Sequence, residues 1–268
     1  MAGSTDKTAD RAVDRTVDRT AEEVVNAAVI IIGNEILSGR TQDTNLNFIA
    51  LTLGEWGIRV AEARVIADDE QVIIDTVNEL RRQNDYVFTT GGIGPTHDDI
   101  TAGCIAKAFG VELVEHPEIA KLIRSREAPP DIMRSRLRMA LVPEGSGLIA
   151  NGTGGPPGFC IGNVYVMAGI PRVMQAMLPS LQQVLRGGAV VQGRSVSAYL
   201  AESEIADGLT AVQDAYPDLS LGSYPFMRDG RYGTNLVVRG TKPDRIDEAL
   251  AQVVIAIEAA GGEALEIS

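Results

Sequence analysis

The stretch that decides the fold is YVFTTGGIGPTHDDIT, residues 86–101. It begins with apolar and β-branched residues typical of a buried strand, and turns at glycines into a segment with apolar side chains at helical spacing. Gly91, Gly92 and Gly94 have no Cβ atom, so backbone N–H groups in this turn can approach an anion closely. The N-terminus of the following helix adds a positive dipole. The turn therefore predicts a phosphate-binding loop at the end of a strand.

Two carboxylates, Asp98 and Asp99, follow these glycines directly. Like charges at an anion site repel unless a cation such as Mg²⁺ lies between them, so loop and acidic pair together predict a metal-bridged phosphate or diphosphate. A second interpretation needs no ligand: Thr96 is a helix N-cap, Asp99 is its capping-box partner, and the glycines serve only the turn. Capping explains Asp99 but not three glycines in four positions, which favours the first interpretation.

The same alternation of strand and helix extends outward from this segment. Strands are predicted at 27–32, 58–66 and 86–90, and apolar residues at helical spacing follow each of them. The alternation predicts right-handed crossovers and a mainly parallel sheet with helices on both faces. We therefore expect an α/β fold, a three-layer α/β/α domain with its site beyond the carboxyl ends of the strands.

The rest of the first domain has weaker patterns. Two short strands are expected at 158–161 and 164–168, and a closing helix at 171–185. The Arg-rich segment 121–138 resembles a helix-loop-helix interrupted at Pro129-Pro130. These elements complete a domain that is predicted to end at Gly187-Gly188.

The two ends of the chain differ from this domain. Residues 1–24 repeat Asp-Arg pairs without a large apolar face, which predicts a disordered tail. Residues 188–268 show a strand-helix-strand-strand-helix order, which predicts a small α+β domain.

Acidic and amide side chains also follow the first two strands. The segment 33–45, GNEILSGRTQDTN, opens on the same sheet edge as the glycine loop, so Glu35, Asp43 and Asn45 are candidates for contacts to a metal or ligand. Equally, this is a surface loop in which Asp43 or Thr44 caps the next helix. Asp68-Asp69-Glu70 follows the predicted strand 58–66 and adds acidic residues at the same edge. The usual preference for acidic residues at a helix N-terminus also explains them.

A second glycine cluster, NGTGGPPG at 151–158, is either a wall of the ligand site or simply a turn. His97 and His116 are the only histidines, and no G-x-S-x-G motif occurs, so acyl transfer is not expected.

Composition excludes several classes of function. The 268 residues have a formal net charge of −12 and only 4% aromatic residues, which disfavours nucleic-acid binding. The longest clean apolar run, 27–32, is far shorter than the ~20 residues of a membrane helix, and no secretory signal precedes it. Cys104 and Cys160 predict neither a zinc site nor a disulfide framework. These features fit a cytoplasmic protein without a membrane partner.

Together with GNEILSG and DTN upstream, the GGIGPTHDD motif (91–99) resembles the molybdopterin-binding (MoCF) domain family. The combined motifs resemble its CinA-type branch, often labelled competence/damage-inducible protein, over about 27–185. The part after Gly188 resembles the small KH-like domain of that branch. The resemblance implies a MogA- and MoaB-like α/β/α fold over 25–187, with a pocket for a pterin or nucleotide diphosphate.

The motifs and the resemblance together assign site residues. Asp99 matches the Asp that ends the glycine motif of MogA and gephyrin relatives, and Asp68 matches the Asp that opens their acidic turn. The expected catalytic residues are Asp68, Asp98 and Asp99, of which the last two would hold Mg²⁺. The expected substrate-binding residues are Gly33, Asn34, Glu35, Asn45, Thr90, Gly91, Gly92, Gly94, Pro95, Thr96, Asn151 and Gly152.

The resemblance also implies two reactions. MogA-like relatives adenylate molybdopterin with ATP and Mg²⁺ in molybdenum cofactor biosynthesis, whereas CinA-type relatives are linked to hydrolysis of dinucleotide pyrophosphates such as ADP-ribose or FAD. Both attack a phosphorus flanked by a metal-neutralised diphosphate. The leading expectation is a Mg²⁺-dependent nucleotide pyrophosphatase. Adenylyl transfer and non-catalytic binding of molybdopterin or a nucleotide are the alternatives, and a homo-oligomer is left open.

Two departures limit what can be transferred from the family. Arg172 follows Gly169-Ile170-Pro171, where family members often have a Glu, so an acidic contribution there is lost. The chain ends at Ser268 without room for the amidohydrolase domain of many CinA-type proteins, so that activity is not expected.

Overall fold

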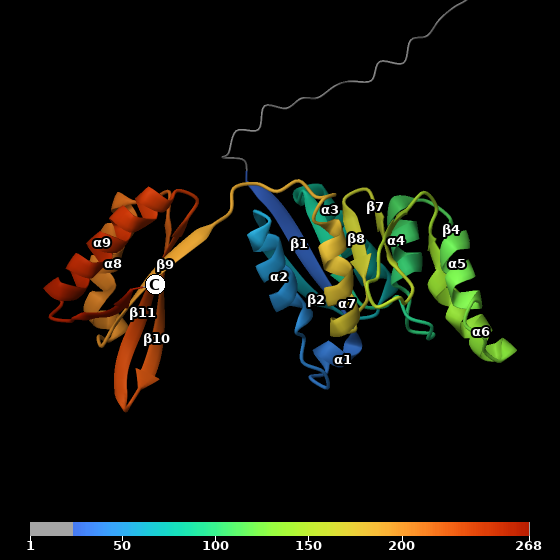
Figure 1. The fold of residues 1–268 in the computed structure, drawn as a ribbon, viewed down its shortest axis with the longest axis horizontal. Helices are drawn as coiled ribbons and strands as arrows, with labels where there is room; N and C mark the ends of the chain where they lie inside the picture. Colours follow the sequence, from blue (N-terminus) through green and yellow to red (C-terminus); the bar gives the residue numbers. More distant parts are fainter. Residues whose placement is uncertain (1–23, 268) are drawn as a thin grey trace, which may run out of the picture.

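The structure, a computed structural model, describes residues 24–267 and shows two bodies joined by a single connection (Figure 1). The predicted disordered tail lies outside the described residues apart from Val24. No helix in the described part of the chain is long and apolar enough to cross a bilayer.

A six-stranded sheet in the order β2-β1-β3-β8-β7-β6 forms the first body. β2, β1, β3 and β8 are parallel to their neighbours, whereas β7 and β6 are added antiparallel at one edge. The mainly parallel sheet predicted from the sequence is confirmed. The strands are β1 Val25–Ile32, β2 Ile58–Ile66, β3 Tyr86–Thr90, β6 Gly147–Ile149, β7 Gly158–Ile161 and β8 Val164–Met167.

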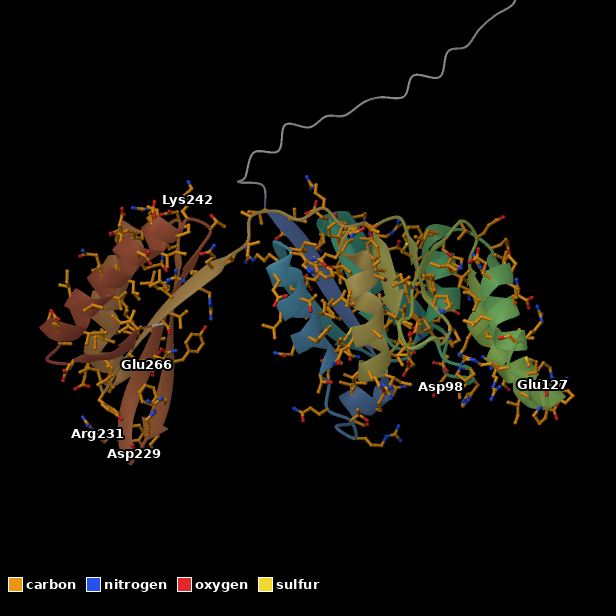
Figure 2. All side chains as sticks on the ribbon, viewed as in Figure 1. Asp98, Glu127, Asp229, Arg231, Lys242 and Glu266 are labelled. Atoms are coloured by element: carbon orange, nitrogen blue, oxygen red, sulfur yellow. The ribbon has the colours of Figure 1, made fainter. Side chains whose placement is uncertain are left out.

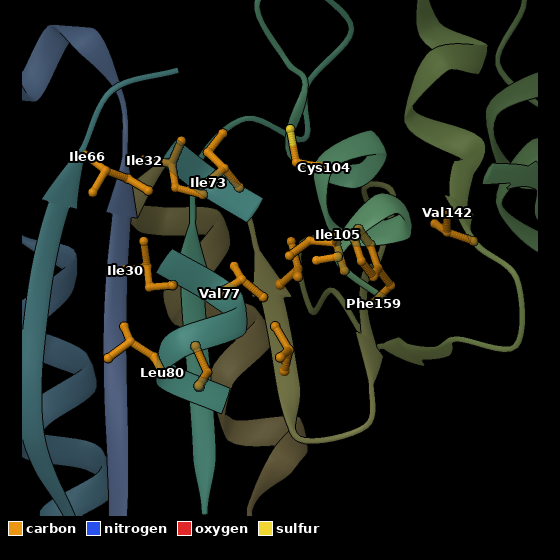
Figure 3. Close-up of a cluster of buried hydrophobic side chains, with 14 of the residues drawn as sticks. Ile30, Ile32, Ile66, Ile73, Val77, Leu80, Cys104, Ile105, Val142 and Phe159 are labelled. Atoms are coloured by element: carbon orange, nitrogen blue, oxygen red, sulfur yellow. The ribbon is translucent and has the colours of Figure 1, made fainter. Parts of the chain in front are cut away.

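Helices cover both faces of this sheet (Figure 1). β1 is buried on both sides, which explains its continuous apolar sequence. Ile30 packs with Val77 and Ile105 of the helices on one face (Figure 3), and Ile31 packs with apolar residues of the helices on the other. The first face has α3 Glu70–Gln83 and α4 Thr101–Phe109; the second has α2 Asn45–Glu55 and α7 Pro171–Met177.

Shorter elements surround the sheet. The predicted helix-loop-helix consists of α5 Pro117–Arg124 and α6 Pro130–Leu137, and a 3₁₀ turn, Arg138–Ala140, follows it. The helix predicted at 171–185 is α-helical only to Met177, because Pro179 has no N–H and the chain continues as a 3₁₀ turn, Leu178–Leu181. Elements that the pattern did not predict are α1 Asn34–Leu37, β6, and the two-stranded sheet of β4 Leu113–Glu115 and β5 Leu141–Pro143.

The second body is a four-stranded antiparallel sheet, β10-β11-β9-β12, with two helices on one face. A fourth strand, β12, follows the predicted strand-helix-strand-strand-helix order. The elements are β9 Gln192–Ala198, α8 Glu202–Ala215, β10 Ser220–Arg228, β11 Arg231–Gly240, α9 Pro243–Ala259 and β12 Ala264–Ile267.

The connection leaves the first body at a tight glycine contact. The N–H of Gly188 donates to the carbonyl of Gly57 at 3.0 Å, and Gly57 has a φ of 74°. A Cβ on Gly187 would lie 2.0 Å from the carbonyl oxygen of Trp56, so only glycine fits there. Because Gly57 directly precedes β2, the chain departs from the amino edge of the parallel strands.

Candidate functional site

A cavity of about 480 Å³ opens where β1, β3 and β8 end. Its volume lies within the ~300–1,000 Å³ usual for small-molecule sites. Glu35 follows β1, the glycine loop follows β3, and Gly169 follows β8, so the expected carboxyl edge of the sheet forms one side of the cavity.

The cavity combines an apolar lining with a few polar groups. The apolar side chains come from the glycine loop, α4, the 3₁₀ turn with β5, β7 and α7, and include Ile93, Ala102, Met139, Leu141, Val142, Phe159, Val173 and Met177. The polar side chains are Glu35, Asp99, Arg138, Asn151 and Thr153. This arrangement suits a flat ring that bears a charged group.

Gly91 and Gly92 are required by close backbone packing. Gly91 has a φ of 106°, and a Cβ there would lie 2.1 Å from the carbonyl oxygen of Ile32 in β1. Gly92 has a φ of 67°, and its Cβ would lie 2.1 Å from the hydroxyl oxygen of Thr101. The hydroxyl of Thr101 in turn donates to the Gly91 carbonyl at 3.0 Å. The glycines therefore hold the loop against the end of β1 and the start of α4.

Asp99 closes the loop on itself. Its carboxylate accepts the N–H of Gly94 at 2.6 Å, the N–H of Thr96 at 2.8 Å and the hydroxyl of Thr96 at 2.5 Å. The Thr96–Asp99 contact of the capping interpretation is present, but Thr96 is not the N-cap of α4. That position belongs to Ile100. The carboxylate turns back to the glycine loop, so the helix begins later than the capping box predicts.

Two backbone donors of the loop remain without a partner. The N–H of Gly91 donates to the Met167 carbonyl at 3.2 Å, and Gly94 donates to Asp99. The N–H groups of Gly92 and Ile93 have no hydrogen-bond partner among residues 24–267, and both residues line the cavity. These two N–H groups can donate to an anion without breaking an existing bond.

Asp98 is separated from this arrangement. Its side chain is 63% exposed and lies outside the cavity lining, at the rim of the first body (Figure 2). A hydrogen bond from Thr96 lowers its pKa, and Nδ1 of His97 is 3.9 Å from its Oδ1. The structure thus places Asp99 on the cavity and Asp98 on the surface.

The loop after β1 is organised by Asp68. Its carboxylate accepts the N–H of Asn34 at 2.8 Å, while the N–H of Gly33 donates to the Ile66 carbonyl at 3.1 Å. The Glu35 carboxylate lies directly over Gly33: a Cβ on that glycine would be 2.5 Å from Oε1 of Glu35. Of these residues only Glu35 lines the cavity. Asp68 therefore acts on the site through the position of this loop.

Three further predicted residues lie behind the cavity lining. Asn45 is 4% exposed and donates through Nδ2 to the Gly169 carbonyl at 2.8 Å, while its Oδ1 has no partner among the described residues. Thr90 is also buried, and its hydroxyl has no partner in the same part of the chain. The N–H of Gly152 donates to the Ala176 carbonyl at 3.3 Å.

Asn151 shapes the wall opposite the glycine loop. Its Oδ1 accepts the N–H of Thr153 at 3.0 Å and its Nδ2 donates to the Pro156 carbonyl at 2.9 Å. The second glycine cluster therefore forms part of the cavity, with Asn151, Thr153, Gly155, Pro156 and Pro157 among the lining residues.

The pattern did not single out Arg138. It lies in the 3₁₀ turn after α6, lines the cavity, and has no ion pair among the residues that the structure describes. The sequence did show an arginine-rich segment that ends at this residue, but spacing alone could not tell which arginine reaches the sheet edge.

The carboxylates fit a cation that arrives with a ligand. Among residues 24–267 no group of three or more His, Cys, Asp or Glu side chains is placed to hold a metal ion. Mg²⁺ is commonly held by one or two carboxylates, water and substrate phosphates rather than by a closed protein cage. Glu35 and Asp99 both line the cavity and supply such oxygens. The Mg²⁺ site thus stays a prediction, and Glu35 and Asp99 provide the kind of oxygen ligands that it requires.

Comparisons with known proteins agree with this geometry. Residues 28–187 match the family described as a probable molybdopterin binding domain, and residues 191–261 match the FAD synthase middle domain. A protein of Archaeoglobus fulgidus is 34% identical over 197 residues, covering 74% of this chain and 84% of that protein. A CinA-like protein of Syntrophotalea carbinolica is 33% identical over 195 residues, covering 68% of this chain and 47% of that protein. The chain thus spans about half the length of that CinA-like relative.

A solved structure shows the same first body. The protein CinA with unknown function from Thermoplasma acidophilum is 34% identical, with a TM-score of 0.54 over 59% of this chain and 98% of that one. The family model matches more than half of this chain, and this solved structure is similar in fold. The chain therefore belongs to the probable molybdopterin-binding domain family, and within it to the CinA-type proteins.

Proposed function

We propose that the cavity binds a nucleotide or pterin by its diphosphate, and that the chain hydrolyses a dinucleotide pyrophosphate such as ADP-ribose or FAD with a divalent cation. One observation supports this most: the N–H groups of Gly92 and Ile93 and the guanidinium of Arg138 share one cavity, and none of them has a hydrogen-bond or ion-pair partner among residues 24–267. Backbone donors beside a guanidinium are a usual environment for phosphate.

Different residues of the cavity would bind the ring, bind the diphosphate and orient the attacking water. Phe159, Met139 and Ile93 offer apolar surface to the flat ring of the ligand. Arg138 and the N–H groups of the loop neutralise and orient the diphosphate. The Glu35 carboxylate lines the cavity and accepts no hydrogen bond from residues 24–267, which leaves it available to orient a water molecule.

The cation has a limited role in this proposal. Glu35 and Asp99 would hold it, and it would supply positive charge that neutralises the charge developing on the phosphate oxygens. The attacking water forms a bond to one phosphorus as the bridging P–O bond breaks, so ADP-ribose gives AMP and ribose 5-phosphate. FAD gives AMP and FMN in the same way.

The second domain supports a dinucleotide in particular. Residues 191–261 match the family described as the middle domain of FAD synthase. This match makes FAD a direct candidate beside ADP-ribose.

The test is a product assay with the full chain. ADP-ribose, FAD, and ATP with molybdopterin are each incubated with Mg²⁺, Mn²⁺, Co²⁺ or a chelator, and products are separated by chromatography. We expect AMP from a dinucleotide alone, only in the presence of a cation. ATP consumption only with molybdopterin would instead establish adenylyl transfer. Calorimetric binding without any product would establish a binding protein.

A further inference from the structure

The sheet of the second domain has one covered and one open face. α8 and α9 pack on the face formed by alternate residues of β9 and β11, among them Val196, Leu236 and Val238. The intervening positions lie on the opposite face, because successive side chains of a strand point to opposite sides. Both helices of the domain lie on the covered side (Figure 1).

The open face combines aromatic rings with arginines. We call Tyr199, Tyr224 and Phe226 the sheet rings, and Arg228, Arg231 and Arg239 the sheet arginines. The register places Arg228 beside Arg231, and the next open-face pair along the hairpin is Phe226 with Gly233. The rings of Tyr199 and Phe226 meet edge to face, with centroids 6.0 Å apart.

Glycines allow the rings to lie against the sheet. A Cβ on Gly233 would be 2.4 Å from Cζ of Phe226, and a Cβ on Gly222 would be 3.1 Å from Cε2 of Tyr224. The rings of Phe226 and Tyr224 therefore occupy the space above glycines, and Tyr224 remains 45% exposed to solvent. Rings held against the sheet in this way offer faces that can stack with another planar group.

The sheet arginines lie over individual sheet rings instead of pairing with acids. The guanidinium carbon of Arg231 lies 3.9 Å from the Tyr199 centroid, and that of Arg228 lies 5.5 Å from the Phe226 centroid. Arg239 lies 5.6 Å from the Tyr224 centroid and donates to its hydroxyl at 3.0 Å. No carboxylate of residues 24–267 forms an ion pair with a sheet arginine. Arg231 stands near the tip of the β10–β11 hairpin (Figure 2).

This local charge differs from that of the whole chain. The net charge of −12 disfavours nucleic acid as a partner, but it sums acidic residues from every surface. An anionic nucleic-acid strand on this face would meet three guanidinium groups that form no ion pair with a carboxylate of residues 24–267. Arginine planes and aromatic rings are the two side-chain surfaces on which unpaired bases stack.

We propose that the open face of the second domain binds single-stranded nucleic acid. The bases stack on the sheet rings and on the guanidinium planes, and the phosphates pair with the sheet arginines. Ring stacking and phosphate contacts do not distinguish one base from another, so we expect binding to tolerate many sequences. It is independent of the cavity in the first domain.

The test measures binding of labelled 12-nucleotide oligouridylate and oligothymidylate to the full chain by fluorescence anisotropy. With three phosphate contacts, log K should fall with log salt concentration with a slope of about −2. Changing all sheet arginines to Gln should abolish this salt dependence and weaken binding more than tenfold. Phe226→Leu should weaken binding roughly tenfold, because stacking contributes about 1–3 kcal/mol per base.

Matched variants separate the proposal from general charge effects. The control replaces three exposed cations of the first domain by Gln and should bind as the wild type does: Arg59, Arg82 and Lys121. Circular dichroism and the melting temperature must show that all variants are folded. A duplex of the same length should bind more weakly than the single strand.

Four results would overturn the proposal. The first is no binding of either oligonucleotide at 50 mM salt. The second is a loss of binding in the control triple variant equal to that in the sheet-arginine variant. The third is concentration-dependent dimerisation that disappears in the sheet-arginine variant while no strand binds, which would show that a second copy covers this face. A duplex bound as tightly as the single strand would contradict the stacking.

Discussion

The carboxylate of Asp99 accepts the backbone N–H of Gly94 at 2.6 Å, so an acid predicted as a metal ligand is also the bond that closes the glycine loop. Thr96 adds two more donors to the same carboxylate. An ionised carboxylate offers about four acceptor positions, which leaves about one for a cation. The shape of the loop and the negative charge of the cavity therefore depend on one side chain.

Replacing Asp99 by Asn should affect both stability and ligand binding. The amide places an NH₂ group where the carboxylate accepts N–H donors, so at least one charge-assisted bond is lost. We expect the free energy of unfolding to fall by about 1–3 kcal/mol and the affinity for ADP-ribose or FAD to fall with it. Urea unfolding and calorimetry measure the two effects.

Asp98→Asn is the control for the neighbouring charge. Its side chain is 63% exposed and lies off the cavity, so affinity and turnover should change little. Equal losses in the two variants would show that Asp98 acts directly at the site.

Gly94→Ala should disturb the loop, whereas Gly103→Ala should not. A Cβ on Gly94 would lie 2.6 Å from Oδ2 of Asp99, which forces the carboxylate away from its donors. Gly103 is in α4 with no atom within 4 Å of a built Cβ, so alanine there should add about 0.5–1 kcal/mol of stability. Melting temperatures that move in the same direction would contradict this account of the loop.

Arg138→Gln should weaken diphosphate binding about tenfold or more, because a hydrogen bond to a charged group contributes about 1.5–3 kcal/mol. Arg138→Lys should restore part of the loss. Arg134→Gln, which removes an exposed arginine paired with Asp131, is the matched control and should leave affinity unchanged. Titrations of ADP-ribose against the three variants distinguish a cavity cation from a general effect of charge.

The buried thiol of Cys104 should make stability depend on alkaline pH. Burial raises its pKa from 9.0 to about 11, so the unfolded chain loses this proton first as pH rises. The stabilising contribution is complete below pH 9 and is lost between about 9 and 11, by about 1 kcal/mol at pH 10. Urea unfolding at pH 8, 9 and 10 should show a decline that is smaller in Cys104→Ala. Parallel curves for the two proteins would argue against this assignment.

The parallel sheet could be predicted because local patterns decide it. Strands such as Tyr86–Thr90 are short apolar runs that end in glycines, and the structure places that strand where the pattern does. The order of strands and helices in residues 188–268 did not fix where the β10–β11 hairpin turns; in the structure β10 ends at Arg228 and β11 begins at Arg231. Asp229-Gly230, both with positive φ, is the tight-turn signal that would have marked its true tip.

The candidate site was harder to predict because its parts are distant in the sequence. Glu35, the glycine loop and Asn151 follow recognisable motifs, and the cavity lining includes them. Arg138 reaches the cavity only through the packing of α5, α6 and the small β4–β5 sheet, which spacing does not encode. Motifs also could not show that Asp99 faces the loop and Asp98 the solvent, since adjacent residues of a turn diverge by backbone geometry alone.

The glycine contact between Gly57 and Gly188 has a consequence for how the two domains serve their ligands. The second domain is tethered at the end of the strands where β2 begins, whereas the cavity opens where these strands finish, about 30 Å further along. A nucleic-acid strand bound to the sheet of the second domain and a small molecule bound in the cavity would therefore not compete for space. Each ligand could bind and dissociate independently of the other.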